Sequence, residues 1–322
     1  MKVSIIVPIW NLEKYLDEMI QSVLQSMEND FELLLVDNGS TDRSGEIIDS
    51  YANGDARIQK LFCEKRGAAA ARNVGLEHAT GRYVVFVDGD DAIAPDYLSK
   101  LTDAMEQNDI VMADCGYTTE YLGKVVDRTS DDKNQTETAE AFLERLFTDD
   151  EKEYDGFIWN KIFIRDIIEK KQLRFDENIS FNEDRLFLTA YLLEEKQIKR
   201  LPDCLYHYRV REDSAMSATR EYFASENEMT EIVAFEKILG LAEPDSTVWM
   251  AVRKNMAYAQ IRLFKRMIDE KQWARYRKSL LRKYARTFYR LAYEPRNKEE
   301  KMLCRKYVFF GWTGISYGKR NG

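Results

Sequence analysis

The sequence predicts an α/β fold with a mostly parallel, Rossmann-like central sheet, followed by a C-terminal all-helical extension. Short apolar segments rich in β-branched residues alternate with amphipathic helical patterns through the first hundred residues. Three of these segments end in a proline or a carboxylate, at Pro8, Asp37 and Asp88, and from residue 221 onward only helical patterns are found. Such alternation is typical of a sheet that helices cover on both faces, with ligands bound beyond the carboxyl ends of the strands.

The elements of the first hundred residues follow from local signals. An apolar stripe predicts the first helix, and Gly81 ends the third, which is rich in alanine. Pro95 opens the fourth helix. The expected strands are 2–8, 31–37, 57–63 and 82–88, and the helices after them are 12–27, 43–51, 67–79 and 95–107.

The remainder of the chain predicts further strands of mixed direction and then helices. Asn182 is expected to cap a helix that begins at Glu183. The pattern places one domain at 1–218 and a second, helical domain at 219–322. Strands are expected at 109–119, 121–127 and 201–210, and helices at 136–147, 164–171 and 183–194.

Composition limits the cellular setting. The chain is 44% apolar, and no run reaches the roughly 18 apolar residues of a membrane span. The N-terminus leads directly into the first strand, so no signal peptide is expected. The four cysteines are far apart and lack metal-site spacing, which favours a reduced, cytoplasmic protein.

Charge is divided unevenly along the chain. Residues 250–322 hold 20 Lys+Arg and 5 Asp+Glu, although the whole chain has a net charge of −8. Apolar and aromatic residues recur at helical spacing among these basic residues. We interpret this segment as an anionic-membrane surface contact, which would place the protein at the inner face of the cell membrane. The alternatives are a helical bundle with solvated basic faces and a homodimer contact.

Three carboxylates follow the fourth expected strand, in Asp88-Gly89-Asp90-Asp91. Asp88 and Asp90 are two residues apart, so in an extended backbone they point the same way, and Gly89 lets a ligand approach the backbone. Close like charges repel unless a cation lies between them, and Mg²⁺ or Mn²⁺ prefers such oxygen ligands. The alternative is an acidic turn exposed to water.

Four segments together resemble the family-2 glycosyltransferases, which have the GT-A fold. They are Ser4-Ile5-Ile6-Val7-Pro8-Ile9-Trp10-Asn11, Val36-Asp37-Asn38-Gly39-Ser40-Thr41-Asp42, Gly67-Ala68-Ala69-Ala70-Ala71-Arg72-Asn73-Val74-Gly75 and Phe86-Val87-Asp88-Gly89-Asp90-Asp91. Three later segments resemble those of bacterial polysaccharide-type members: Trp159-Asn160-Lys161, Asn182-Glu183-Asp184-Arg185 and Tyr206-His207-Tyr208-Arg209. The resemblance covers about residues 1–215.

The resemblance implies that the first two strand ends bind the donor nucleotide. Trp10 would stack on the base, beside Pro8 and Asn11; the alternative is a partly buried core aromatic. The family usually has tyrosine at this position. Asp37 would contact the nucleotide, and its alternative is an Asx-turn with Ser40 or Thr41.

The third and fourth segments would hold the diphosphate and the metal. Arg72 would bind the diphosphate, with Gly67 allowing close approach; the alternative is an ordinary surface arginine. Asp90 would ligate Mn²⁺ or Mg²⁺, and Asp88 the ribose or the ion, in what resembles the family's DxD motif. His207 is a candidate third ligand, and its alternative is a structural role.

Catalysis would depend on the later segments. By resemblance Asp184 is the general base of an inverting transfer, with Glu183 holding the acceptor, and the helix dipole would keep Asp184 ionised. Trp159 lines an acceptor pocket or belongs to the core.

The sequence thus predicts a metal-dependent inverting glycosyltransferase of hexosyltransferase type. It would move a sugar from a nucleotide-sugar, with uridine diphosphate expected, to a saccharide or lipid-linked saccharide in surface polysaccharide synthesis. No nucleic-acid partner is expected. The alternative is a noncatalytic nucleotide- or polyanion-binding protein on the same fold. A nicotinamide-dependent oxidoreductase is excluded, because Pro8-Ile9-Trp10-Asn11 replaces the glycine fingerprint.

Overall fold

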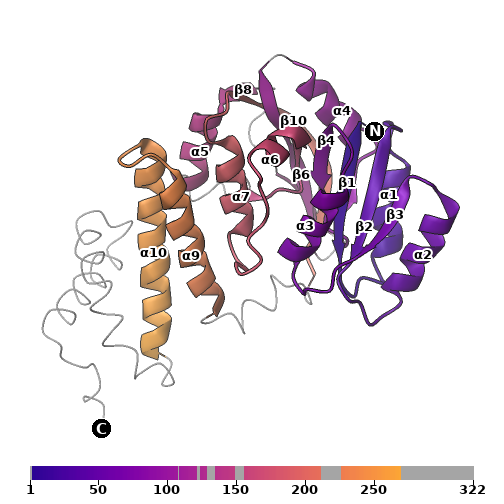
Figure 1. The fold of residues 1–322 in the computed structure, drawn as a ribbon, viewed down its shortest axis with the longest axis horizontal. Helices are drawn as coiled ribbons and strands as arrows, with labels where there is room; N and C mark the ends of the chain where they lie inside the picture. Colours follow the sequence, from indigo (N-terminus) through magenta and orange to yellow (C-terminus); the bar gives the residue numbers. More distant parts are fainter. Residues whose placement is uncertain are drawn as a thin grey trace, which may run out of the picture. The chain divides into compact units, whose positions relative to one another are not determined.

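The computed structural model describes residues 2–107, 109–121, 124–128, 135–148, 156–211 and 226–269 (Figure 1). Its internal contacts divide the chain into two units, residues 1–217 and 218–322.

The first unit begins with a parallel sheet in the order β3-β2-β1-β4 (Figure 1). Its strands are short and buried, which suits a sheet covered on both faces. The strands and intervening helices are β1 (Val3–Ile9), α1 (Leu16–Leu24), β2 (Phe31–Asp37), α2 (Ser44–Gly54), β3 (Ile58–Phe62), α3 (Ala68–His78) and β4 (Tyr83–Phe86).

The sheet continues with strands of both directions. Beyond β4 the order is β9-β6-β10-β5, in which β6 and β10 run parallel and β9 is antiparallel to both β4 and β6. Two further strands pair at the margin, β7 with β6 and β8 with β10. The elements are β5 (Ala92–Ile93), α4 (Tyr97–Met105), β6 (Ile110–Tyr121), β7 (Lys124–Arg128), β8 (Gln135–Thr138), α5 (Ala139–Thr148), β9 (Lys161–Ile164), α6 (Arg165–Lys170), α7 (Glu183–Leu192) and β10 (Gln197–Arg209).

The strand alternation creates two core layers. Val3, Ile5 and Val7 face a large apolar cluster that also contains residues of α1, α2 and α4. On the other face, the Phe86 ring contacts Phe187 of α7 edge-on, with centroids 6.0 Å apart. Successive side chains of a strand point to opposite faces of the sheet, so residues of α1, α2 and α4 pack on one face and α7 packs on the other.

The register brings the strand ends to one edge of the sheet. Ile9 at the end of β1 pairs with Asp37 at the end of β2, and Asp37 pairs with Phe62 of β3. The Val87 amide donates to the Ile6 carbonyl at 3.0 Å, which aligns the residues after β4 with this edge. Pro8, Asp37 and Asp88 thus lie at the carboxyl end of the parallel strands, where ligands bind in such sheets.

The α/β fold with a largely parallel central sheet and C-terminal helices is confirmed, with differences in detail. The predicted helix at 136–147 begins at Ala139, because Gln135–Thr138 pairs as strand β8 along β10. The sequence analysis also missed Lys161–Ile164, the short strand that links β4 to β6. A four-residue strand carries too little periodicity to be recognised.

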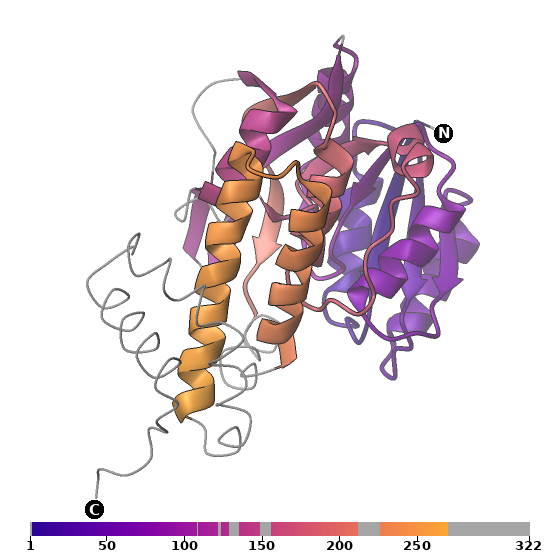
Figure 2. The same ribbon diagram turned by 60° about the vertical axis from the view of Figure 1, so that its left-hand side comes forward.

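In the second unit, α9 (Glu226–Leu241) and α10 (Thr247–Asp269) lie side by side (Figures 1 and 2). Buried residues such as Phe235 and Val252 form their apolar side, and the Arg262 Nη2 is 2.7 Å from Glu231 Oε1. Across the described residues, no helix combines the length and apolarity needed to cross a bilayer. Most of the basic segment, residues 270–322, lies outside the described residues.

Candidate active site

A buried arginine lies among three carboxylates beyond the carboxyl end of β4. Arg72 of α3 is 5% exposed. Its Nη1 is 3.1 Å from Asp184 Oδ1 and 3.5 Å from Glu183 Oε1, and its Nη2 is 3.2 Å from Asp88 Oδ1. The alternative of an ordinary surface arginine is therefore wrong, and the guanidinium joins α3, the start of α7 and the loop after β4.

Burial has the largest single effect on the pKa values of Arg72 and Asp184. Burial by itself would lower the pKa of the Arg72 guanidinium, but Asp184, Asp88 and Glu183 together raise it above its usual value. Burial raises the pKa of Asp184 to about 8; Arg72 opposes this shift, and Glu183 and Asp88 add to it. The expectation that the helix dipole keeps Asp184 ionised at neutral pH is not met in the free protein.

The entry to α7 has an unusual backbone. Asn182, which precedes the helix, has a left-handed φ of 69°, a conformation that asparagine tolerates better than most residues. Its carbonyl accepts the Leu186 amide at 3.1 Å. This turn presents Glu183 and Asp184 to Arg72 in the first helical turn.

The loop after β4 is fixed from β10. The Tyr206 hydroxyl donates to Asp91 Oδ2 at 2.7 Å and accepts the Asp88 amide at 3.1 Å, and the Arg209 amide donates to Asp91 Oδ1 at 2.8 Å. Asp91 is 1% exposed, and burial raises its pKa well above the usual value, with Asp90 and Asp88 adding to the shift. Asp91 thus holds the loop that carries Asp88 and Asp90.

Asp88 and Asp90 form the part of the site that can take a divalent cation. Burial raises the pKa of Asp90, the Asp88 carboxylate adds to the shift, and Arg211 opposes it with its Nε 2.8 Å from Asp90 Oδ2. No group of three or more His, Cys, Asp or Glu side chains suited to a metal occurs in the described parts of the chain. Mg²⁺ is commonly held by one or two carboxylates with substrate phosphates, so Asp88 and Asp90 fit this kind of binding.

His207 is not brought to these carboxylates. Its Nδ1 is 2.8 Å from the Thr118 hydroxyl on β6. Neighbouring residues of a strand point to opposite faces, and Tyr206 is the one directed at Asp88 and Asp91. The structural role, rather than metal ligation, agrees with this placement.

The residues expected at the nucleotide lie in loops after β1 and β2. Trp10 is 52% exposed, which argues against the core alternative, and the Arg66 guanidinium carbon is 5.2 Å from its ring centroid. Asn11 Oδ1 accepts the Thr41 amide at 2.8 Å, which ties the two loops together. Pro8 lies in β1, one residue before the strand ends.

Asp37 forms a turn with Ser40, which is the alternative to its predicted contact with the nucleotide. Its Oδ1 accepts the Ser40 amide at 2.9 Å, and the residue is 8% exposed. This hydrogen bond forms the Asx-turn, and it leaves the nucleotide contact of Asp37 as a prediction.

Two glycines of the predicted site have different structural reasons. Gly67 precedes α3 with φ 124°, a backbone conformation that favours glycine, and its amide donates to Asn38 Oδ1 at 2.7 Å. At Gly89, a Cβ would lie 2.7 Å from Leu12 Cδ1. Gly89 therefore packs closely against the Leu12 side chain, and the approach of a ligand to its backbone stays a prediction.

Trp159 belongs to the core. It is 3% exposed and stacks on Tyr206 with centroids 4.3 Å apart, between Phe157 and Tyr208, which also stack on it. The structure supports the core alternative over acceptor contact. The stack matters to the site indirectly, because it fixes the Tyr206 ring whose hydroxyl holds the loop after β4.

Sequence reasoning missed Arg211, Tyr206 and Arg66. Tyr206 lies in a motif that the sequence analysis singled out, so its family pattern was a usable signal. Arg211 and Arg66 have no such signal, because each is defined by a partner distant in the sequence, at Asp90 and at Trp10 respectively.

Comparison with known proteins gives the following relationships. Residues 4–171 match the family described as Glycosyl transferase family 2. The chain is similar to the uncharacterized glycosyltransferase EpsJ of Bacillus subtilis, at 36% identity over 216 residues that form 66% of this chain and 62% of EpsJ. It is also similar to the minor teichoic acid biosynthesis protein GgaA of B. subtilis, at 32% identity over 233 residues, 68% of this chain and 50% of GgaA. The chain therefore spans less than two thirds of the length of these relatives.

Solved structures share the fold at lower identity. Staphylococcus aureus TarS residues 1–349 in complex with UDP-GlcNAc has a TM-score of 0.70 and 21% identity, over 99% of this chain and 93% of that chain. The mannosyltransferase PcManGT of Pyrobaculum calidifontis, in complex with GDP-Man and Mn²⁺, has a TM-score of 0.56 and 15% identity, over 98% of this chain and 88% of that chain.

Proposed function

The chain belongs to glycosyl transferase family 2, with the GT-A fold, and we propose that it transfers a sugar from a nucleotide-sugar to a saccharide hydroxyl with inversion of the anomeric carbon. We propose uridine diphosphate as the leaving group. This choice is supported by the family resemblance and by S. aureus TarS, a structure of the same fold solved with UDP-GlcNAc.

The contacts of Arg72 carry the proposal. One guanidinium reaches Asp88, on the side proposed for the donor, and Asp184, on the side proposed for the acceptor. The side chain of Arg72 thus contacts both carboxylates, although 96 positions separate Asp88 from Asp184 in the chain. A protein that only binds nucleotides has no need of a partly buried carboxyl group such as Asp184 at this place.

The proposed reaction is a single displacement. The acceptor hydroxyl oxygen attacks the anomeric carbon, the bond from that carbon to the diphosphate oxygen breaks, and the nucleoside diphosphate leaves with the electron pair. Asp184, in its ionised form, takes the proton of the acceptor hydroxyl. Arg72 holds Asp184 in place and adds positive charge near the departing phosphates.

Asp88 and Asp90 would hold a divalent cation, Mn²⁺ or Mg²⁺. When bound there, such an ion would neutralise charge on the diphosphate. The chain's own residues prepare this position: Asp91, Tyr206 and the Arg209 backbone fix the loop, and Arg211 balances Asp90 in the free protein.

The nucleotide base would lie against Trp10. Its ring is half-exposed, and Arg66 lies over it. Arg66 would cover the base or turn toward a phosphate when the donor binds. Asp37 and Asn11 would complete this end of the site.

The acceptor setting is proposed as surface polysaccharide assembly on a saccharide or lipid-linked saccharide. Similarity to GgaA, which is named for minor teichoic acid biosynthesis, supports a cell-surface polymer. The basic segment 250–322 would bind an anionic membrane. Sedimentation with anionic vesicles checks this: the full chain should sediment, and vesicle binding that persists after removal of 250–322 would exclude the segment as the anchor.

The central experiment is a panel of nucleotide-sugars with Mn²⁺, scored by thermal shift and by transfer to saccharide acceptors. We expect a uridine diphosphate sugar to stabilise the protein. Asp184→Asn should keep that stabilisation and lose transfer, because it retains the shape of the side chain without a basic oxygen. Asp166→Asn is the matched control, since Asp166 has a 73% exposed side chain on α6. Full transfer activity in Asp184→Asn would exclude the proposed base.

A further inference from the structure

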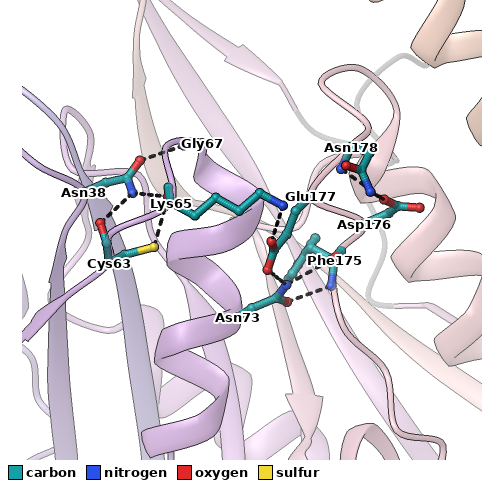
Figure 3. Close-up of polar contacts among 9 residues, drawn as sticks. All are labelled: Asn38, Cys63, Lys65, Gly67, Asn73, Phe175, Asp176, Glu177 and Asn178. Atoms are coloured by element: carbon teal, nitrogen blue, oxygen red, sulfur yellow. Dashed lines mark hydrogen bonds and ion pairs between the residues drawn. The ribbon is translucent and has the colours of Figure 1, made fainter.

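Helix α3 holds the catalytic region through two adjacent residues. Arg72 contacts Asp184 at the start of α7, and Asn73 contacts the segment that leads to it. Figure 3 shows the Asn73 side chain facing Phe175 and Glu177 from the helix. The two contacts thus lie on either side of the turn at Asn182.

The amide of Asn73 is fully engaged with that segment. Its Nδ2 donates to the Phe175 carbonyl at 2.9 Å and to Glu177 Oε1 at 3.1 Å, and its Oδ1 accepts the Phe175 amide at 2.8 Å. The side chain therefore pairs with both backbone groups of one residue, as a neighbouring strand would. Asn73 is 7% exposed and Phe175 is 3% exposed, so solvent cannot replace these hydrogen bonds without local opening.

The segment from residue 172 to Asn182 has no helix or strand of its own. Side-chain contacts therefore help to fix its path. The Phe175 ring stacks on Phe187 of α7 with centroids 4.3 Å apart, and Lys65 Nζ is 2.7 Å from Glu177 Oε2 (Figure 3). The Lys65 pair is half-exposed and therefore weak. The buried amide of Asn73 pairs directly with the backbone of this segment, at Phe175.

We propose that Asn73 is a positioning residue for Asp184. By fixing Phe175, it sets where the segment reaches Asn182 and hence where α7 presents Asp184 to Arg72 and the donor side of the site. This inference rests on the proposed function, in which Asp184 is the base. Asn73 does not itself touch substrate.

We expect the loss of the Asn73 amide to lower kcat, the rate of transfer in the enzyme–substrate complex. A misplacement of about 1 Å in a catalytic group can lower a rate by about 100-fold. Asn73→Ala should therefore lower kcat by about 100-fold and change KM for the donor by less than about twofold, since Trp10 and Asp37 are untouched. Rates are referred to the concentration of donor-binding sites, so that loss of folded protein does not count as loss of kcat.

Asn178→Ala is the matched control. Asn178 lies in the same segment, is exposed, and contacts Asp176 within the segment through its side chain (Figure 3). Its kcat should remain within about twofold of the original. Glu177→Ala is a second test that keeps the buried Phe175 pairing and so folds: it should lower kcat by less than Asn73→Ala, with KM for the donor unchanged.

Hydrogen exchange provides a readout that needs no activity. Peptides covering 175–184 should exchange faster in Asn73→Ala than in Asn178→Ala, because the Phe175 amide loses its acceptor. Faster exchange together with an unchanged kcat would overturn the inference and leave the proposed function intact. A raised KM at unchanged kcat would also overturn it. Native protein that binds nucleotide-sugars and transfers none would overturn the proposed function, and the inference with it.

Discussion

Replacing Arg72 by methionine tests the charge balance of the site without any assay of activity. The guanidinium is shared by Asp88, Glu183 and Asp184 and is 5% exposed, so methionine leaves three carboxyl groups around an apolar side chain. Removing one partner of a buried ion pair typically destabilises a protein by about 3–5 kcal/mol. The carboxylates keep 18–29% of their side-chain exposure, which favours the lower end, about 3 kcal/mol, near pH 8.

The loss should be smaller in acid, and the sign follows from proton binding. Without Arg72, which opposes the shift, the pKa of Asp184 in the folded state rises further above its unfolded value. A group with a raised folded pKa binds more protons when folded, so stability falls as pH rises from the unfolded pKa to the folded pKa. Asp184 already has a folded pKa of about 8 beside Arg72, so its share of the loss is small at lower pH and develops as pH rises above about 8.

Urea unfolding at about pH 6 and about pH 9, followed by near-ultraviolet circular dichroism, measures this difference. Arg82→Met is the control, because Arg82 pairs with Glu106 at 3.4 Å across side chains that are 63% and 50% exposed. Its effect should be below about 1 kcal/mol at both pH values. A loss for Arg72→Met that is equal at both pH values, or larger in acid, would refute the shared-charge account.

Three further outcomes are expected. Because burial raises the pKa of Asp184 to about 8, kcat/KM for transfer should rise with pH to a plateau above about 8; a pH-independent profile, with metal and donor saturating, would contradict its role as base. Asp90→Asn should raise the Mn²⁺ concentration needed for turnover by at least about tenfold, and chelation should abolish turnover; activity indifferent to chelator would exclude the metal. Arg211→Ala should tighten Mn²⁺ binding to the donor-free protein in calorimetry, because its Nε competes 2.8 Å from Asp90 Oδ2, whereas weaker binding would show that Arg211 supports the site.

The sequence correctly predicted where some of the candidate site residues lie in the fold, and these positions follow from local patterns. Asp88 and Asp90 follow an apolar strand directly, and the end of a parallel strand is a fixed place in the fold. Pro8 and Asp37 were placed by the same rule, and the register of β1 with β2 confirms that they lie at one edge. No tertiary information is needed for such residues beyond the strand pattern itself.

The contacts that hold the site together were not predicted, because the residues that form them are distant from one another in the chain. Asp91 is held by Tyr206 across 115 positions, and Asp184 is held by Arg72 across 112. Sequence spacing constrains contacts only within a helix turn or a strand pair. The burial of Trp159 could not be predicted for the same reason, because its ring packs on Tyr206 and Tyr208 of the distant strand β10.

Two effects of opposite sign act on the pKa of Asp184: the dipole of α7, which sequence can predict, and burial in the tertiary structure, which it cannot. A helix dipole stabilises a carboxylate in the first turn by about 0.3–1 kcal/mol, and on that basis the sequence predicts an ionised group. Burial, to which Glu183 and Asp88 add, moves the pKa of Asp184 from 3.8 to about 8 in spite of Arg72, which corresponds to roughly 6 kcal/mol and exceeds the dipole several times. The Glu183 and Asp88 carboxylates both add to this shift in the pKa of Asp184. Neutralisation of Asp88 on the donor side would therefore favour the ionised base on the acceptor side. The fold achieves this coupling by placing one arginine between two segments that no local sequence pattern relates.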